Sequence, residues 1–279
     1  MFSPYVRGLI LKHGEDWRAK WHEETVRRLD EWRINTAAAW SDGDLRRPYV
    51  SFCAGWGDTP RVPTESGFLG VPDVFDPSFE TNVAAAAEAA EKLKDDPWLI
   101  GWCTANEMGW YGDWEHGMNR VNLIHAGPKS LAAKSAWIDA LKAGYADIAS
   151  LNEAWGTQHA SFAGVEMPRG PAFSMPWSDF LDFRFSAMAE RFAWHYQAVR
   201  SRDRSRLALT CNHGDLYHGD WYAAMGARPE WYASSADGFE TGQIMFGSDP
   251  DYFNLLYMES LAGFGKPISP NRLAYKFPD

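Results

Sequence analysis

The sequence is poor in cysteine, has an excess of acidic over basic residues and lacks long apolar runs. Its three cysteines, Cys53, Cys103 and Cys211, are too few and too far apart for a disulfide framework or a cysteine-rich zinc site. No run of 18 apolar residues occurs, which argues against a membrane-spanning helix. The chain does not open with a basic segment followed by an apolar one, so no signal peptide is expected. The expected location is cytoplasmic, or secreted or periplasmic if an N-terminal segment has been removed.

Basic charge is also scarce. The 27 basic and 37 acidic residues give a net charge of −10, and no basic stripe offsets it. A chain of this kind repels nucleic acids and anionic membranes, so neither is an expected partner. No glycine-rich phosphate loop and no serine nucleophile elbow follows an expected strand. We therefore expect no cofactor.

Tryptophan, in contrast, is abundant, with 15 residues in 279. A Trp side chain offers a large rigid apolar face and an N–H donor, which suits stacking against a sugar ring. The alternative is a core rich in tryptophan. High tryptophan content together with acidic charge points to carbohydrate as the ligand class.

Strands and helices are expected to alternate along most of the chain. The expected strands are residues 34–40, 49–54, 98–105, 206–211, 235–239 and 266–271, and residues 5–12 could form a seventh. The expected helices are residues 16–32, 79–94, 178–200 and 249–264, and residues 132–155 are expected to form one helix or two. Loops after the strands are longer than loops before them, which is typical of an α/β fold of the (β/α)8 TIM-barrel type.

We therefore expect one barrel domain over residues 1–279. The strand count falls short of eight, and three explanations stay open. The chain is a fragment of a longer enzyme, a partner such as a second copy completes the barrel, or a strand has been missed.

The pair Asn106-Glu107 is the strongest local signal for chemistry. It follows the apolar strand at 98–105 and is followed by Trp110. A carboxylate at the end of a buried strand is partly desolvated, which raises its pKa toward that of a general acid. The adjacent amide can hold a sugar hydroxyl. The alternative is a strand-end glutamate that simply meets solvent.

Several segments resemble clan A glycoside hydrolases, in particular the family 42 β-galactosidases and the family 50 agarases. Residues 71–79, 96–102 and Asn106-Glu107 carry the resemblance most clearly. Residues 28–36 with Trp40-Ser41-Asp42, and residues 145–156, extend it. Together these segments cover roughly residues 16–215.

The resemblance implies a (β/α)8 barrel and a retaining mechanism with two carboxylates about 5–5.5 Å apart. It implies that Glu107 is the acid/base and that Asn106 and Asn212 lie near the sugar. The family's nucleophile follows a Lys-Pro pair at the seventh strand, but here Lys266-Pro267 is followed by no carboxylate. Glu240, at the end of the expected strand 235–239, is the substitute we consider. Its alternative role is packing or capping within a loop.

Further substrate contacts are expected in the loops that follow strands. His213, in the doubled His-Gly-Asp stretch 212–221, is expected to bond sugar hydroxyls. Trp40 and Trp110 are expected to stack on sugar rings, and Asp42 is included although such a residue is more often a turn or helix cap. Two His and two Asp within that stretch could also bind a metal, but their spacing matches no metal signature, and no metal is expected.

The first interpretation is therefore a β-glycoside hydrolase acting on an oligosaccharide or polysaccharide. It would be a β-galactosidase- or agarase-like enzyme with Glu107 as acid/base and Glu240 as the uncertain second carboxylate. A second interpretation is a carbohydrate-binding pseudoenzyme or an incomplete barrel that lacks the strand-seven nucleophile. A third is a metal-dependent hydrolase that uses His213, His218 and the two neighbouring aspartates.

Overall fold

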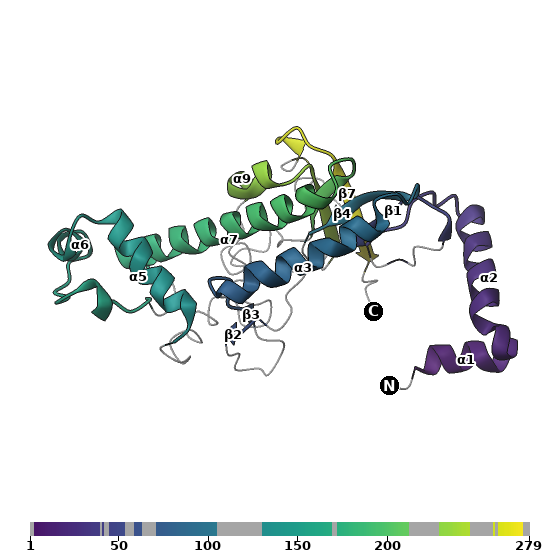
Figure 1. Ribbon diagram of the computed structural model, residues 1–279, viewed down its shortest axis with the longest axis horizontal. Helices are drawn as coiled ribbons and strands as arrows, with labels where there is room; N and C mark the ends of the chain where they lie inside the picture. Colours follow the sequence, from purple (N-terminus) through teal and green to yellow (C-terminus); the bar gives the residue numbers. More distant parts are fainter. Residues whose placement is uncertain are drawn as a thin grey trace.

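The architecture was analysed in a computed structural model of the 279-residue chain (Figure 1). The structure describes residues 3–39, 41, 45–53, 59–62, 71–104, 130–168, 172–211, 229–245, 259 and 262–275. Its α-helices are α1 (Pro4–His13), α2 (Trp17–Glu31), α3 (Pro77–Leu93), α5 (Ala132–Gly144), α6 (Ile148–Trp155), α7 (Met175–Arg202) and α9 (Pro229–Tyr232). Its strands are β1 (Tyr49–Phe52), β2 (Arg61–Val62), β3 (Val71–Pro72), β4 (Leu99–Cys103), β5 (Leu207–Cys211), β6 (Gly238–Met245) and β7 (Ile268–Tyr275).

The main sheet has the order β1-β4-β5-β6-β7, and every neighbouring pair in it is parallel. Strands β2 and β3 form a separate two-residue antiparallel pair inside the expected loop 57–77. Parallel neighbours joined by helical crossovers confirm the α/β class, and five such strands are part of the eight in a closed (β/α)8 barrel. The described part of the chain is thus an incomplete barrel.

The two faces of the sheet pack differently. On the helix side, Tyr49, Leu99, Trp102 and Ala208 pack against α3 and α7, which run side by side (Figure 1). On the opposite side, which corresponds to the inside of a barrel, the buried side chains form a small cluster. That cluster contains Ala39, Val50, Cys103 and Leu209. At the adjacent pairs Tyr49-Val50, Trp102-Cys103 and Ala208-Leu209 the division follows from alternation, because successive side chains point to opposite faces.

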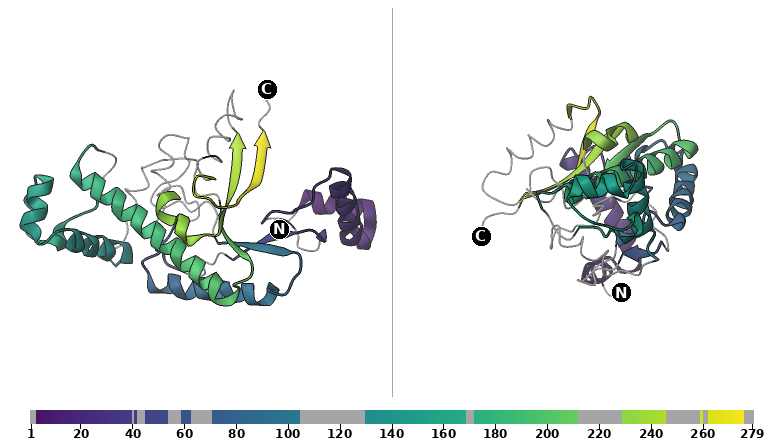
Figure 2. Two further views of the ribbon diagram at one scale, coloured as in Figure 1. Left: turned by 90° about the horizontal axis from the view of Figure 1, so that it is seen from above. Right: turned by 90° about the vertical axis from the view of Figure 1, so that its left-hand side faces the viewer.

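The longest helix, α7, connects the sheet to a second core. Its first half packs with α3, α5 and α6, where Trp137, Phe180 and Phe183 meet edge to face. Figures 1 and 2 show α5 and α6 at one end of the molecule and α1 and α2 at the other. Trp137 and Trp177 are buried in this core, so part of the tryptophan content serves packing.

Two expectations about the N-terminal third are wrong. Residues 5–12 form helix α1, not a strand, because Ser3 caps the helix through its Oγ and Pro4 occupies the first turn. Residues 34–39 make only an isolated parallel bridge, between Ala37 and Tyr49.

The other elements lie close to their expected positions. Residues 132–155, expected as one helix or two, form two helices, α5 and α6, separated by a short turn at Tyr145. Strand β6 runs past its expected end at residue 239, because its pairing with β7 continues to Met245. Most of the expected helix 249–264 lies outside the described residues.

Candidate active site

The carboxyl ends of β1, β4, β5 and β6 lie at one edge of the parallel sheet. In barrels of this kind the functional side chains come from the segments that follow these ends. The segments after β4 and β5 contain the Asn106-Glu107 pair, Asn212 and His213. The topology therefore brings together the strands from which the predicted catalytic residues emerge.

Asn106 and Glu107 themselves lie outside the described residues, but the strand that leads to them is firmly placed. Thr104, the last described residue before them, donates from its backbone N–H to the carbonyl of Leu209 (2.9 Å) and from its hydroxyl to the same oxygen (3.1 Å). On the other side of β4, the N–H of Cys53 donates to the carbonyl of Cys103 (2.9 Å). The polypeptide thus enters residues 105–129 from the middle of the sheet.

The far end of that segment is fixed by Asp73, which the sequence interpretation did not single out. The Asp73 carboxylate accepts hydrogen bonds from the backbone N–H of Ala133 (3.1 Å) and of Phe75 (3.2 Å). It therefore satisfies a free N–H in the first turn of α5. The residue is 1% exposed, and burial raises its pKa above the ordinary value. The sequence signal that could have identified Asp73 is its position within residues 71–79, a segment that resembles glycosidases.

Glu240 lies in register with Cys211 of β5 and with Ser269 of β7. It is the third residue of an eight-residue strand, so its expected position at a strand end is wrong. Position 240 shares its sheet face with Gly238, where an added Cβ would lie 2.9 Å from Leu209 of the inner cluster. This is the inner face of the barrel. One strand separates β6 from β4, which sets their backbones about 10 Å apart.

The remaining predicted site residues lie outside the described residues. They are Trp40, Asp42, Trp110, Asn212 and His213. Asn212 directly follows Cys211, whose backbone is in register with Glu240. His218 and the rest of the 212–221 stretch also lie outside the described residues, and the described residues contain no group of three metal-ligating side chains.

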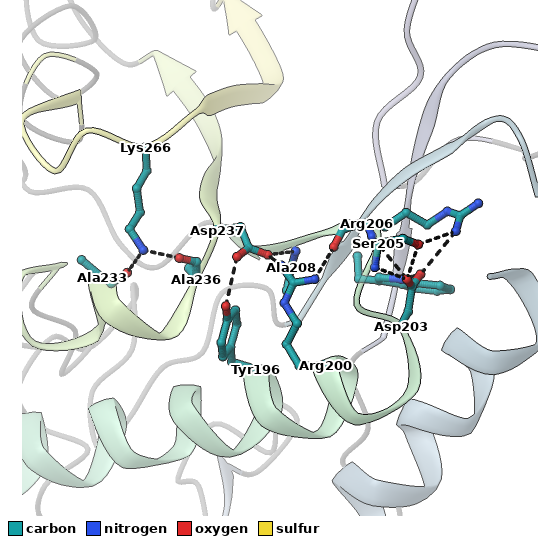
Figure 3. A network of polar contacts seen from close by, with 11 residues as sticks. Tyr196, Arg200, Asp203, Ser205, Arg206, Ala208, Ala233, Ala236, Asp237 and Lys266 are labelled. Carbon is teal, nitrogen blue, oxygen red and sulfur yellow. Dashed lines mark hydrogen bonds and ion pairs between the residues drawn. The ribbon is translucent and has the colours of Figure 1, made fainter. Parts of the chain in front are cut away.

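Polar contacts at the opposite end of the sheet hold the strands in place (Figure 3). The Asp237 carboxylate accepts from the hydroxyl of Tyr196 (3.0 Å) and the N–H of Ala208 (2.7 Å), and it pairs with Arg200. Lys266 donates to two backbone carbonyls, those of Ala233 and Ala236. These contacts connect α7 with the starts of β5, β6 and β7.

Asp203 makes a second junction in the same layer. Its carboxylate accepts from the indole N–H of Trp102 (2.9 Å) and from the N–H of Ser205 (2.9 Å). Burial by itself would raise the pKa of Asp203, but these hydrogen bonds outweigh it and lower the pKa. The end of the sheet away from the site is therefore the part that fixes strand register.

Cys53 and Cys103 are buried free thiols. Burial raises the pKa of the Cys53 thiol to about 11, which keeps it protonated at neutral pH. Neither its burial nor its protonation suits a nucleophile.

Comparison with known proteins agrees with this geometry. The glycoside hydrolase 42 family model, described as "Beta-galactosidase", matches residues 74–227, which is more than half of the chain. The chain belongs to this family. The match includes Asn106, Glu107, Asn212 and His213 and ends before Glu240. The likeness to clan A glycoside hydrolases expected from the sequence is thereby confirmed.

Two agarases of Vibrio sp. (strain JT0107) are also similar to this family 42 chain. Beta-agarase B is 30% identical over 247 residues, which cover 82% of this chain and 25% of the agarase. Beta-agarase A is 29% identical, with 84% of this chain and 24% of the agarase covered. The chain therefore spans about a quarter of the length of these relatives.

Solved structures show the same fold. An exo-beta-agarase superposes with a TM-score of 0.73 at 25% identity, covering 96% of this chain and 36% of the agarase. A beta-galactosidase from Bacillus circulans sp. alkalophilus superposes with a TM-score of 0.63 at 15% identity, covering 88% of this chain and 41% of the galactosidase. Among the described residues of this family 42 chain, no helix is long and apolar enough to cross a membrane.

Proposed function

We propose that this chain is catalytic machinery of a β-glycoside hydrolase that cleaves β-galactosidic bonds in a polysaccharide. The observation that carries the proposal is the family 42 match across Asn106-Glu107, at a point where the chain leaves a central strand of a parallel sheet. The similarity to two beta-agarases supports a galactose-containing polysaccharide as the substrate.

In this proposal Glu107 protonates the glycosidic oxygen as the bond breaks and then removes a proton from the attacking water. Asn106 holds a sugar hydroxyl beside the reacting carbon, and Asn212 and His213 bind hydroxyls from the neighbouring strand end. Trp40 and Trp110 supply apolar faces for sugar rings, with Asp42 at the rim.

Glu240 is the proposed nucleophile. It would attack the anomeric carbon and form a covalent glycosyl-enzyme, which water releases with retained configuration. Its support is the inner-face position next to β5, in register with the residue that precedes Asn212. In this proposal the two carboxylates lie about 5–5.5 Å apart, as in retaining enzymes.

Hydrolysis of paired substrates tests these roles. Glu107→Gln should slow cleavage of an agarose oligosaccharide roughly 10²- to 10⁴-fold, because its leaving group needs a proton. It should slow cleavage of an activated dinitrophenyl β-galactoside much less, whereas Glu240→Gln should slow both alike.

The control is Glu153→Gln, on the exposed side of α6, which should leave both rates unchanged. Equal rates of oligosaccharide cleavage by the wild-type chain and Glu107→Gln would contradict the proposal. So would a wild-type chain that cleaves neither substrate.

A further inference from the structure

A cavity of about 540 Å³ lies at the end of the sheet away from the candidate active site. It is formed between the last turns of α2 and the segments that precede β1 and β4. Its lining is Val26, Leu29, Asp30, Arg33, Ile34, Asn35, Arg46, Arg47, Pro48 and Trp98. The volume falls within the roughly 300–1,000 Å³ of small-ligand sites.

The charge of this cavity differs from that of the whole chain. Arg47 is buried and pairs with Asp30, and it also donates to the carbonyls of Ile34 (2.9 Å) and Leu45 (3.1 Å). Asp30, the single acidic group among the described lining residues, is thus neutralised by Arg47. Arg33 and Arg46 remain as two cations at the cavity of a chain whose net charge is −10.

Arg33 and Arg46 are exposed, and within the described chain neither makes a side-chain hydrogen bond or ion pair. Two guanidinium groups that line one cavity give it a positive potential that favours an anion. Arginine binds sulfate, phosphate and carboxylate through paired N–H donors. These two side chains are therefore available to an anionic ligand.

The backbone places Arg33 at a position that normally takes glycine. It follows the C-cap of α2 with a φ of 58°, in the left-handed region. The N–H groups of Arg33 and Ile34 donate to the carbonyls of Asp30 (3.0 Å) and Leu29 (2.9 Å), which is a Schellman motif. Glycine is the usual residue at this position, and an arginine adopts this backbone conformation only at a cost in conformational energy. A binding role for the Arg33 side chain would explain why arginine stands here.

The same hydrogen bonds reduce the repulsion that the carboxyl end of α2 would exert on a bound anion. The carboxyl end of a helix carries partial negative charge through its free carbonyls. Here the carbonyls of Arg28, Leu29 and Asp30 accept from Trp32, Ile34 and Arg33. The helix end therefore presents few free carbonyls to the cavity.

Arg46, on the segment that precedes β1, also has a backbone in the left-handed region, with a φ of 53°. The same lining includes Trp98 and Ile34, which supply apolar surface and are each 42% exposed, and Asn35, which supplies an amide. A tryptophan face beside polar donors suits a sugar ring, and the arginines suit a negative substituent on it.

We propose that this cavity is a second carbohydrate site that binds an anionic saccharide bearing a sulfate ester or carboxylate. Arg33 and Arg46 hold the anionic group, and Trp98 packs against the ring. The anion site stands on the cavity alone, whereas the choice of a saccharide rests on the proposed function. The site would hold a charged polysaccharide at the end of the barrel opposite to catalysis.

Calorimetric titration of the full chain tests this proposal. The probes are a sulfated galactan oligosaccharide, the same oligosaccharide after desulfation, and sodium sulfate alone. A Glu107→Gln background prevents turnover. We expect the sulfated probe to bind about tenfold or more tightly than the desulfated one, with affinity falling as salt rises.

The variants Arg33→Gly and Arg46→Gly should each weaken binding of the sulfated probe about tenfold or more. Both place glycine where the backbone has positive φ, so folding is not expected to suffer. Trp98→Ala should weaken the sulfated and desulfated probes alike. The control Arg18→Ala, near the opposite end of α2, should bind as the parent does.

Equal affinity for the sulfated and desulfated probes would overturn the proposal, as would unchanged binding by Arg33→Gly. Binding of sodium sulfate as tight as that of the oligosaccharide would overturn the saccharide assignment. If the proposed function is wrong, hydrolysis will not depend on Glu107. If only this inference is wrong, hydrolysis that depends on Glu107 will be unchanged.

Discussion

Gly238 begins β6 where the backbone of the next strand leaves no room for a side chain. A Cβ added there would lie 2.7 Å from the carbonyl oxygen of Pro267 and 2.9 Å from Leu209 Cδ2. The first of these atoms belongs to the backbone and cannot rotate away. Close approach of β6 to β7 therefore depends on this glycine.

Gly238→Ala should lower the free energy of unfolding by about 1–3 kcal/mol, because the strands must separate to admit the methyl group. Urea denaturation of the two proteins measures this difference. The control is Gly144→Ala at the end of α5, where nothing lies within 4 Å and no loss is expected. A Gly238→Ala protein as stable as the parent would show that β6 can shift without cost.

Some candidate site residues stand out in the local sequence, but others depend on tertiary contacts. Asn106-Glu107 stands out because a polar pair interrupts a run of apolar residues at a strand end. Asp73 does not stand out, since its role depends on Ala133, 60 residues later in the chain. Glu240 remains a predicted site residue, and its place within the strand was predicted wrongly because pairing with β7 lengthens β6 past it.

At the scale of elements, helix signals proved more reliable than strand signals. Helices α2, α3 and α7 lie within a few residues of the expected ranges, since their apolar spacing is sustained over many turns. Residues 5–12 were mistaken for a strand because a short apolar run does not distinguish the two. The Ser3-Pro4 start signal was the deciding feature.

Helix α7 also carries the clearest titrating group. His195 is fully buried on this helix, its Nδ1 lies 2.9 Å from the carbonyl oxygen of Arg191, and its ring meets Phe79 edge to face. Burial lowers the pKa of His195 from 6.5 to about 4. The folded protein therefore disfavours the protonated ring, which the unfolded chain accepts freely.

The sign of the pH effect follows from this lowered pKa. Between pH 6.5 and about pH 4 the unfolded chain binds a proton at His195 that the folded chain does not, so stability falls as the pH falls. The shift corresponds to about 3 kcal/mol at most. The measurement is the free energy of unfolding as a function of pH. Its slope between pH 6.5 and about pH 4 should be smaller in His195→Gln than in the parent protein. Identical slopes in the two proteins would contradict the assignment.

At the scale of the whole molecule, the described sheet has five parallel strands in the order of a barrel segment. The α/β class and the barrel topology followed from alternating strands and helices with long loops after the strands. The strand count was less predictable. Residues 34–39 make one bridge instead of a strand, because Ala37 alone aligns with Tyr49.

The two ends of this sheet have different roles. Asp203, Asp237 and Lys266 hold one end through a network that joins α7 to four strands (Figure 3). The other end carries the strand termini from which the family 42 residues emerge. This division, with stability at one end and chemistry at the other, is the general arrangement of (β/α) barrels.

Azide rescue of Glu107→Gly tests the central claim most directly. With a dinitrophenyl β-galactoside, this variant should accumulate a glycosyl-enzyme, because the second carboxylate still expels the activated leaving group but no base assists water. Added azide should attack the anomeric carbon without needing that base and release the enzyme carboxylate. The account predicts faster turnover with azide and a β-galactosyl azide product, identified by NMR. No acceleration by azide, or an α-configured azide, would contradict a retaining glycosidase with Glu107 as acid/base.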